Sequence, residues 1–266
     1  MLEDLSSKDK VVGLKQVRRA IVCGRAGHVF LARDADPRLT GPLEDCCREA
    51  GVPVSGGYTM AQLGRACGID YGVGNLFSLK SSLAHLGLDA AVSADPADIR
   101  AADRLILPGV GAFGDAMAKL EATGLVPVIK EEAEKKPLLG ICLGMQLLFE
   151  KSFEYGEHPG LGFVPGQVCP LAPDLGDKTL KVPQIGWNAV HILRDDPIFK
   201  YVRDGEYFYY VHSYYGKNCA ANTLAVSDYS LPVTGVVKAG RVYGTQFHPE
   251  KSGDAGLRLL RAFSEL

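Results

Sequence analysis

Hydrophobic and polar positions follow a helical period in some segments of the chain and a strand-like pattern in others. Residues 75–85 predict a helix, because their apolar positions lie on one face. These apolar positions are Leu76, Leu79, Leu83 and Leu86. Residues 104–107 are a short apolar run that leads into a Pro-Gly pair, so we expect a strand and then a loop. Residues 125–136 begin apolar and end charged, which predicts a helix terminated by Pro137.

The C-terminal part of the chain is richer in strands. The expected strands lie at 207–211, 223–226, 233–238 and 241–247. A final helix is expected over 253–263, with Leu257, Leu260 and Phe263 facing inward. This order predicts an α/β fold with a mixed, largely parallel open sheet and helices on both of its faces. Catalytic loops are expected at the carboxyl ends of the parallel strands.

One cysteine stands at a predicted strand-to-helix turn. A short buried strand over 138–141 runs into a helical stretch, and Gly140 and Gly144 flank Cys142. Glycine at these positions allows the sharp bend that presents a nucleophile above the edge of a sheet. The dipole and the free N–H groups at the N-terminus of the helix favour a thiolate over a thiol. Cys142 is therefore a candidate nucleophile.

A base and a carboxylate follow about a hundred residues later, in the sequence Thr245–Glu250. His248 would take the proton of Cys142, and Glu250 would hold the imidazole in the correct orientation. A lone cysteine is more often a buried structural residue. The flanking glycines and the His-Pro-Glu sequence together favour catalysis over that alternative.

Composition narrows the class of protein without identifying it. The 266 residues are 47% hydrophobic and carry a net charge of −2, so the chain can bury a sizeable core and has no general nucleic-acid or membrane footprint. The seven cysteines form neither a disulfide framework nor a paired metal-binding pattern. Apolar runs are too short to span a membrane, and no signal-peptide pattern is present. We therefore expect a soluble cytoplasmic protein without a metal or another cofactor.

Seven segments carry a resemblance to a known family. They are Asp70–Leu76, Leu107–Phe113, the turn at Cys142, Gly160–Phe163, Pro183–Asn188, Tyr209–Tyr214 and Thr245–Glu250. Their order is that of the class I (triad) glutamine amidotransferases, and the chain from about Gly68 to Leu266 resembles in particular the glutaminase subunit of imidazole glycerol phosphate synthase. The cysteine turn and the His-Pro-Glu sequence indicate only the broad class, whereas the other segments indicate the subfamily.

The resemblance implies hydrolysis of glutamine to glutamate and ammonia. Cys142 would attack the side-chain amide, His248 would protonate the departing ammonia, and water would hydrolyse the glutamyl thioester. The oxyanion would be held by the N–H groups of Leu143 and, after a peptide reorientation, of Val110. The substrate would be held by Gly109, Gln146 and the backbone of Ser213 and Tyr214. A polar surface role is the alternative for Gln146.

The resemblance also implies a partner, a (β/α)-barrel cyclase subunit that receives the ammonia through an interior channel. The heterodimer would be a C–N lyase that makes imidazole glycerol phosphate in histidine biosynthesis. Residues expected to face the cyclase are Asn75, Lys181, Gln184, Trp187 and Asn188. Trp187 is the only tryptophan, and it would be either an interface anchor or a core residue. Coupling through the Val110 peptide would leave the isolated chain with little glutaminase activity.

Three N-terminal segments carry a second resemblance, and they are 13–20, 29–37 and 63–69. They are similar to the small kink-turn RNA-binding ribosomal proteins. This implies a small α/β/α module over residues 1–66, with Lys15, Gln16 and Arg19 at a helix end in contact with the kinked RNA. A solvated basic helix face is the alternative for these three residues.

The two resemblances compete for the residues around position 68. We predict that Ala66–Asp70 is a strand of the larger sheet, because an unfilled interior position would leave backbone groups unpaired. The amidotransferase domain would then span 67–266, and the N-terminal module would lack its last strand and expose a sheet edge. Since no linker separates the modules, a chimeric reading frame is favoured over a natural fusion.

Two other functions stay open. One is a different class I amidotransferase, serving for instance purine, pyrimidine, folate or anthranilate synthesis, against which the segments around Gly72 and Trp187 argue. The other is an RNA-binding fusion with a vestigial amidotransferase domain, against which the intact Cys142, His248 and Glu250 argue.

Overall fold

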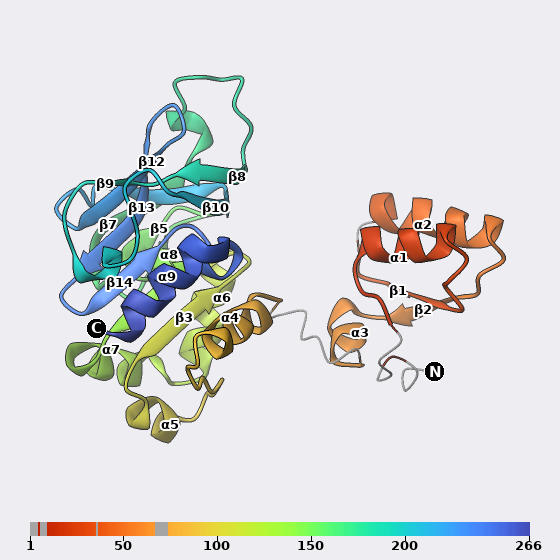
Figure 1. Ribbon diagram of the computed structural model, residues 1–266, viewed down its shortest axis with the longest axis horizontal. Coiled ribbons are helices and arrows are strands. Elements are labelled where there is room, and N and C mark those ends of the chain that lie inside the picture. The colour runs from red at the N-terminus through yellow and green to blue at the C-terminus, as the bar shows by residue number, and fades with distance from the viewer. Residues whose placement is uncertain (1–4, 6–9, 36, 67–73) are drawn as a thin grey trace. The chain divides into compact units, whose positions relative to one another are not determined.

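The computed structural model describes residues 5, 10–35, 37–66 and 74–266, and the chain divides into two compact units, Met1–Phe77 and Ser78–Leu266 (Figure 1). The domain boundary expected between residues 66 and 67 adjoins residues 67–73, which lie outside the described part of the chain. That boundary therefore stays a prediction.

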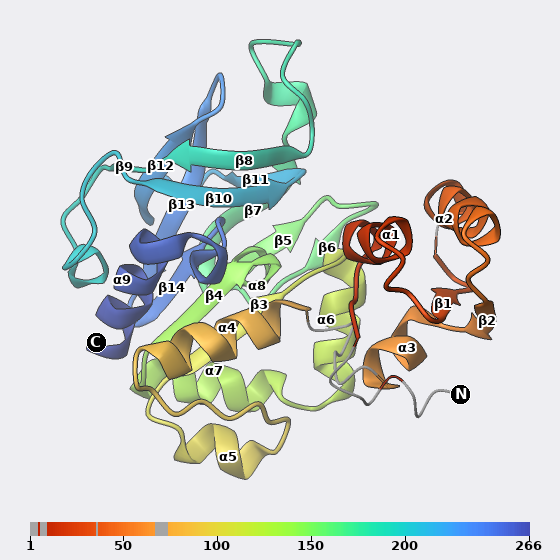
Figure 2. The same ribbon diagram turned by 45° about the vertical axis from the view of Figure 1, so that its right-hand side comes forward.

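The N-terminal unit is a small α/β arrangement. Its elements in chain order are α1 (Leu14–Val22), β1 (Val29–Ala32), α2 (Pro37–Glu49), β2 (Val54–Tyr58) and α3 (Met60–Ala66). Strands β1 and β2 are parallel, with Val29 opposite Val54. Helices α1 and α2 lie on one side of the two strands, and Ile21, Leu43 and Cys47 pack there against β1 (Figure 2).

The strand predicted over Ala66–Asp70 is wrong at its first residue. Ala66 is the last residue of helix α3, and residues 67–70 lie outside the described part of the chain. The segment before Ala66, Met-Ala-Gln-Leu-Gly-Arg, consists mostly of good helix formers with the buried Leu63 as its anchor. Local helix propensity therefore prevails at this position over the demand of the larger sheet.

The described residues of the C-terminal unit contain a six-stranded mixed sheet in the order β3-β4-β14-β13-β12-β9. Their bounds are β3 (Leu105–Gly109), β4 (Leu138–Cys142), β9 (His191–Ile192), β12 (Thr223–Asp228), β13 (Pro232–Ala239) and β14 (Val242–Thr245). Strands β3, β4 and β14 are parallel, and the other pairs are antiparallel. Strand β4 ends at the predicted nucleophile, Cys142, and the neighbouring strand β14 leads to the predicted base, His248.

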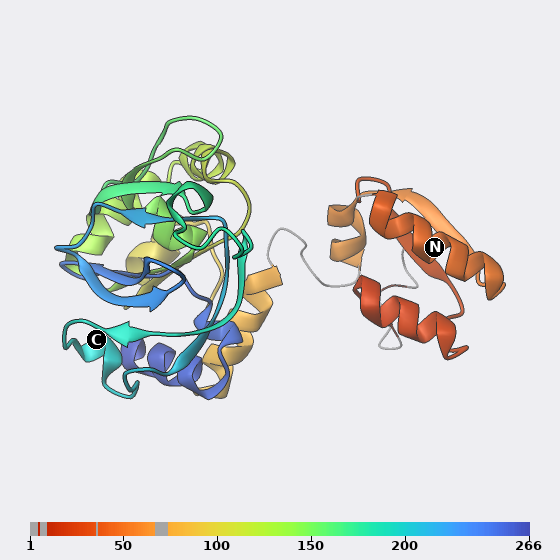
Figure 3. The same cartoon turned by 90° about the horizontal axis from the view of Figure 1, so that it is seen from above.

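Helices cover both faces of this sheet. Adjacent residues of a strand point to opposite sides, so the apolar strands offer side chains to helices on each face. On one face, α4 (Gly74–His85) and α9 (Gly253–Ser264) lie side by side and pack against Leu139 and Ile141 (Figure 3). On the other face, α6 (Phe113–Ala122) and α7 (Val126–Lys135) pack against Leu138. The short helix α5 (Pro96–Ala101) is capped at its N-terminus by Asp95, whose side chain accepts from the Ala97 N–H.

Two smaller sheets complete the unit. One has the order β11-β7-β5-β6, and the other pairs β8 with β10. Their bounds are β5 (Phe149–Ser152), β6 (His158–Pro159), β7 (Val164–Pro170), β8 (Gln184–Ala189), β10 (Tyr207–His212) and β11 (Tyr214–Lys217). The remaining helices are α8 (Leu143–Leu147), η2 (Ala172–Asp174), η3 (Pro197–Phe199) and η4 (Pro249–Lys251). Among the described residues, no helix has the length and apolar character that a membrane span requires.

Most predicted elements of this unit are confirmed to within a few residues. They are the helices expected at 75–85, 125–136 and 253–263, and the strands expected at 104–107, 138–141, 207–211, 223–226, 233–238 and 241–247. Strand β14 ends at Thr245, two residues before the predicted end, because the chain leaves the sheet there and turns into the short helix η4 (Pro249–Lys251). The mixed α/β sheet with helices on both faces agrees with the predicted fold class. The expectation of a largely parallel sheet is not met by the described strands, because two of its strand pairs are parallel and three are antiparallel.

Candidate active site

Cys142 is the last residue of β4 and sits at a strained turn. Its backbone adopts φ 55° and ψ −110°, and helix α8 begins at the next residue. A side chain at Gly144 would overlap the carbonyl oxygen of Leu107 on β3. This close approach is why the turn requires glycine there. A positive φ at a non-glycine residue costs free energy and is typical of functional positions.

The loop after β3 lies directly beside this turn. Gly109 is the register partner of Cys142, and a Cβ atom at Gly109 would stand 2.8 Å from the backbone nitrogen of Gly144. Val110 follows with an exposed side chain, and Gly111 has φ 100°. Val110 and Leu143, the two residues predicted to supply oxyanion donors, therefore follow two paired positions at the ends of adjacent strands.

His248 and Glu250 form a buried pair. The Nδ1 atom of His248 lies 2.8 Å from Oε1 of Glu250, and each side chain is about 1% exposed. The backbone fixes this geometry, since the His248 N–H donates to the Tyr209 carbonyl at 2.9 Å and the Ser252 hydroxyl donates to the His248 carbonyl. Burial lowers the pKa of His248, but hydrogen bonds to Cys142 and Glu250 outweigh it and raise that pKa to about 9.

The three predicted catalytic side chains thus meet at one place. The Cys142 sulfur is hydrogen-bonded to His248 and also lies 3.9 Å from the Val211 carbonyl oxygen on β10. Glu250 contacts Nδ1 of the same imidazole. A nucleophile, a base and an orienting carboxylate in this arrangement can carry out acyl transfer through a thioester.

The predicted substrate residues lie next to this group. Gln146, on α8 four residues after Cys142, is buried, and its Nε2 donates to the Tyr214 carbonyl at 2.9 Å. The Ser213 carbonyl accepts from the Leu171 N–H at 2.9 Å, which fixes the segment between β10 and β11. The burial of Gln146 argues against the alternative of a surface residue.

Two buried polar residues of this region were not assigned a role from the sequence. Nδ1 of His212 lies 2.9 Å from the Tyr214 carbonyl oxygen, and burial lowers the pKa of His212 to about 4. Gln246, directly before Phe247 and His248, is completely buried and contacts both Gln146 and Cys142. Both residues lie inside segments that carry the family resemblance, Tyr209–Tyr214 and Thr245–Glu250. Their position in those segments does not reveal which side chains they contact.

An exposed apolar face is formed by one side of β8 and β10, and we call it the β8–β10 face. Its residues are Ile185, Trp187, Tyr207, Tyr209 and Val211. Trp187 is 53% exposed and stands opposite Tyr209, with 6.1 Å between their ring centroids. Trp187 is therefore a surface residue rather than a core residue. Val211 belongs to this face while its carbonyl oxygen approaches the Cys142 sulfur.

The other predicted partner residues differ in exposure. Lys181 is exposed, and Asn188 is half-buried and accepts from Nε2 of Gln184 at 3.0 Å. Gln184 is completely buried, because it lies on the opposite side of β8 from Trp187, so its side chain cannot face a partner. Asn75 belongs to helix α4, and its side chain lies outside the described part of the structure.

The predicted RNA contacts lie on α1. Gln16 and Arg19 are exposed, and the side chain of Lys15 lies outside what the structure describes. Gly13, with φ 103°, precedes the helix.

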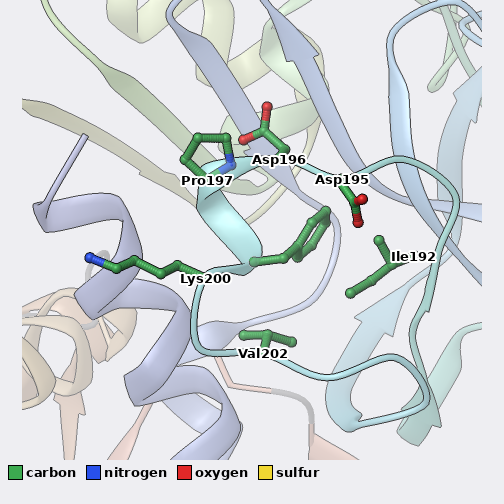
Figure 4. A pocket seen from close by; sticks show the side chains of 7 residues that line it. Ile192, Asp195, Asp196, Pro197, Lys200 and Val202 are labelled. Carbon is green, nitrogen blue, oxygen red and sulfur yellow. The ribbon is translucent and has the colours of Figure 1, made fainter.

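The hollow shown in Figure 4 lies apart from Cys142, on the loop around η3, and has a volume of about 430 Å³. Its lining residues are Ile192, Asp195, Asp196, Pro197, Phe199, Lys200 and Val202. Asp196 is paired with Lys238, and Lys200 with Glu265, so these charges already have partners. In the described ranges, no group of three His, Cys, Asp or Glu side chains is arranged to hold a metal ion.

Comparison with known proteins agrees with this geometry. The class I glutamine amidotransferase family model matches residues 68–265, and the chain belongs to that family. Proteins named imidazole glycerol phosphate synthase subunit HisH are similar over nearly their whole length. The one from Lacticaseibacillus casei is 50% identical over 199 residues, 74% of this chain and 94% of the relative. The one from Caldanaerobacter subterraneus is 46% identical over 200 residues, which are 74% of this chain and 96% of the relative. This chain is accordingly a HisH-type glutamine amidotransferase.

Solved structures with the same fold are more distant in sequence. A crystal structure of a glutamine amidotransferase matches with a TM-score of 0.56 at 22% identity, covering 71% of this chain and 92% of that one. A protein from Thermoplasma acidophilum that is described as a GMP synthase subunit matches with a TM-score of 0.52 at 22% identity, covering 71% and 85%. These likenesses confirm the predicted fold class. The ribosomal protein L7Ae/L30e/S12e/Gadd45 family model matches residues 2–83, in agreement with the second resemblance.

Proposed function

We propose that this chain hydrolyses glutamine through Cys142, His248 and Glu250 and delivers ammonia to the cyclase subunit of an imidazole glycerol phosphate synthase. The observation that carries the proposal is the buried chain of contacts from Glu250 through His248 to the Cys142 sulfur at a strained turn. The HisH relatives support the pathway. We also assign the complex to the cytoplasm, because reduced cysteines fit that compartment.

The reaction follows from the arrangement of these groups. The Cys142 thiolate attacks the side-chain amide carbon, and the N–H groups of Leu143 and Val110 stabilise the oxyanion. The His248 imidazolium protonates the leaving nitrogen, so ammonia departs and a glutamyl thioester remains. His248, now neutral, removes a proton from water, which attacks the thioester and releases glutamate and the thiol. Gly109, Gln146, Ser213 and Tyr214 bind the rest of the substrate.

We propose that the cyclase docks on the β8–β10 face, with Trp187 as the anchor and Lys181 at its border. Exposed aromatic residues are favoured at the centres of protein interfaces. Strand β10 connects this face to the nucleophile, because the Val211 carbonyl oxygen lies 3.9 Å from the Cys142 sulfur. A docked partner can therefore shift the peptide groups around Cys142, including the Val110 peptide, and couple the two active sites.

Glutamate release should rise by about ten- to a hundredfold when the purified chain is given a cyclase subunit together with its nucleotide substrate, which is the usual range of coupling between sites. A Trp187→Ala variant should lose this stimulation and keep the unstimulated rate. Leu193→Ala is the matched control, because Leu193 is an equally exposed apolar residue outside the β8–β10 face. Glutaminase activity that ignores the cyclase would assign the chain to another amidotransferase system.

We propose as a second function that the N-terminal unit binds kink-turn RNA through Lys15, Gln16 and Arg19. The match to the L7Ae family over residues 2–83 and the exposure of Gln16 and Arg19 on α1 support this. The amidotransferase residues remain intact, so RNA binding would accompany the enzyme activity rather than replace it.

A gel-shift experiment with the full chain and a kink-turn RNA should give submicromolar affinity that weakens as salt rises. Arg19→Ala should weaken binding by about tenfold, whereas Arg48→Ala, which removes an exposed arginine on α2 beside Asp45, should not. Equal binding to an RNA of the same composition without a kink would contradict the proposal.

A further inference from the structure

A chain of buried hydrogen bonds connects the predicted substrate-binding residue to the nucleophile. Nε2 of Gln146 lies 2.9 Å from the Tyr214 carbonyl oxygen and 3.1 Å from Oε1 of Gln246. Nε2 of Gln246 lies 3.9 Å from the Cys142 sulfur. Gln246 has no exposed surface, so it can exchange none of these contacts for water.

The network fixes the orientation of both amides. The Tyr214 carbonyl oxygen can only accept, so the Gln146 side chain must present its NH₂ group there. The second N–H of the Gln146 amide donates to the Gln246 side chain, so Gln246 must present its oxygen, Oε1, as the acceptor. The nitrogen of Gln246 is therefore the atom that faces the sulfur of Cys142. A flipped Gln246 amide would put two NH₂ groups against each other.

We propose that Gln246 is a positioning residue that aims an amide N–H at the Cys142 sulfur and holds Gln146 in place for the substrate; this inference rests on the proposed function of Cys142. A hydrogen bond from a neutral donor stabilises the thiolate without adding a net charge. The same N–H remains beside the sulfur of the thioester, while Gln146 keeps its orientation through the whole cycle.

Other groups also face the sulfur, and they act differently. His248 interacts with the sulfur directly, and Glu250 binds Nδ1 of His248. These two residues therefore act on the sulfur through the positive charge of the imidazolium. His212 interacts electrostatically with His248. The Val211 carbonyl oxygen can accept from a thiol but repels a thiolate. Among the described contacts of the sulfur, Gln246 thus provides a donor that cannot titrate and that opposes this repulsion.

The test is the pH dependence of Cys142 alkylation by iodoacetamide, followed by mass spectrometry of the peptide that contains Cys142. In Gln246→Glu, a carboxylate of the same shape replaces the donor, so the midpoint of alkylation should move up by about one pH unit or more. Gln246→Met, which removes the donor without adding a charge, should move it in the same direction by less. Thr245→Val is the matched control, because Thr245 is equally buried and donates only to the Phe247 carbonyl.

An unchanged midpoint in both Gln246 variants, or an equal shift in Thr245→Val, would overturn the inference. If Gln246→Glu does not fold, the comparison of Gln246→Met with Thr245→Val decides it. Alkylation needs no glutamine turnover and no cyclase. An inactive chain whose midpoint shifts as expected would therefore contradict the proposed function, and with it the substrate role of Gln146, but would support the contact between the Gln246 N–H and the Cys142 sulfur.

Discussion

Replacement of Cys142 with alanine is expected to lower the rate of glutamine hydrolysis by about 10⁴-fold or more, because no thioester can form without the sulfur. The fold should persist, since the side chain is small and the strained backbone of the turn is set by its neighbours. Alanine also has a Cβ, so the positive φ at this position is no worse than in the parent chain. Binding of the cyclase should be unchanged.

The measurement is glutamate release in the presence of the cyclase and its nucleotide, with binding followed separately by calorimetry. Cys219→Ala is the matched control, because Cys219 is 4% exposed, against 8% for Cys142, and the described hydrogen-bond partners of its sulfur are Thr223 and Thr234. It should keep the rate within about twofold. Substantial turnover by Cys142→Ala would mean that another group is the nucleophile, and joint loss of turnover and cyclase binding would indicate a folding defect.

The sequence predicts those parts of the site whose residues lie close together along the chain. The bend at Cys142 depends on glycine at 140 and 144, and the His248–Glu250 contact joins residues two apart on one short segment. Local chemistry determines both. The long helices and buried strands of the C-terminal unit were predictable for the same reason, because each has its own apolar period.

The contacts that join distant segments were not predictable. Strand β7 contains two prolines and a glycine, which hide its strand character, and it forms because β5 and β11 provide partners. Gln184 was expected to face the partner because the family resemblance implied it, but alternation along β8 turns its side chain inward. Gln246 contacts two residues that lie 100 and 104 positions earlier in the chain, and only the packing of β14 beside β4 reveals these contacts.

Glu250→Gln is expected to lower kcat/KM for glutamine by about 10³-fold or more, although the two side chains have the same shape. The carboxylate accepts from Nδ1 of His248 at 2.8 Å in a site from which water is excluded, so its charge is what stabilises the imidazolium. A neutral amide cannot do this, and its NH₂ group can trap the imidazole in the wrong tautomer.

The pH profile separates this effect from a loss of structure. The pKa of His248 is raised to about 9, so the imidazolium that protonates the leaving ammonia is present at neutral pH and is lost as pH rises through 9. The basic limb of kcat/KM, which reports the free enzyme, should therefore lie near pH 9 in the parent enzyme. It should move to lower pH in Glu250→Gln, because one of the groups that raise the pKa of His248 has lost its charge. Glu206→Gln is the matched control, since its partly buried carboxylate pairs with Arg258, away from His248. It should leave the limb in place. A basic limb that does not move in Glu250→Gln would show that Glu250 does not set the proton affinity of His248, and the orienting role would then belong to another group.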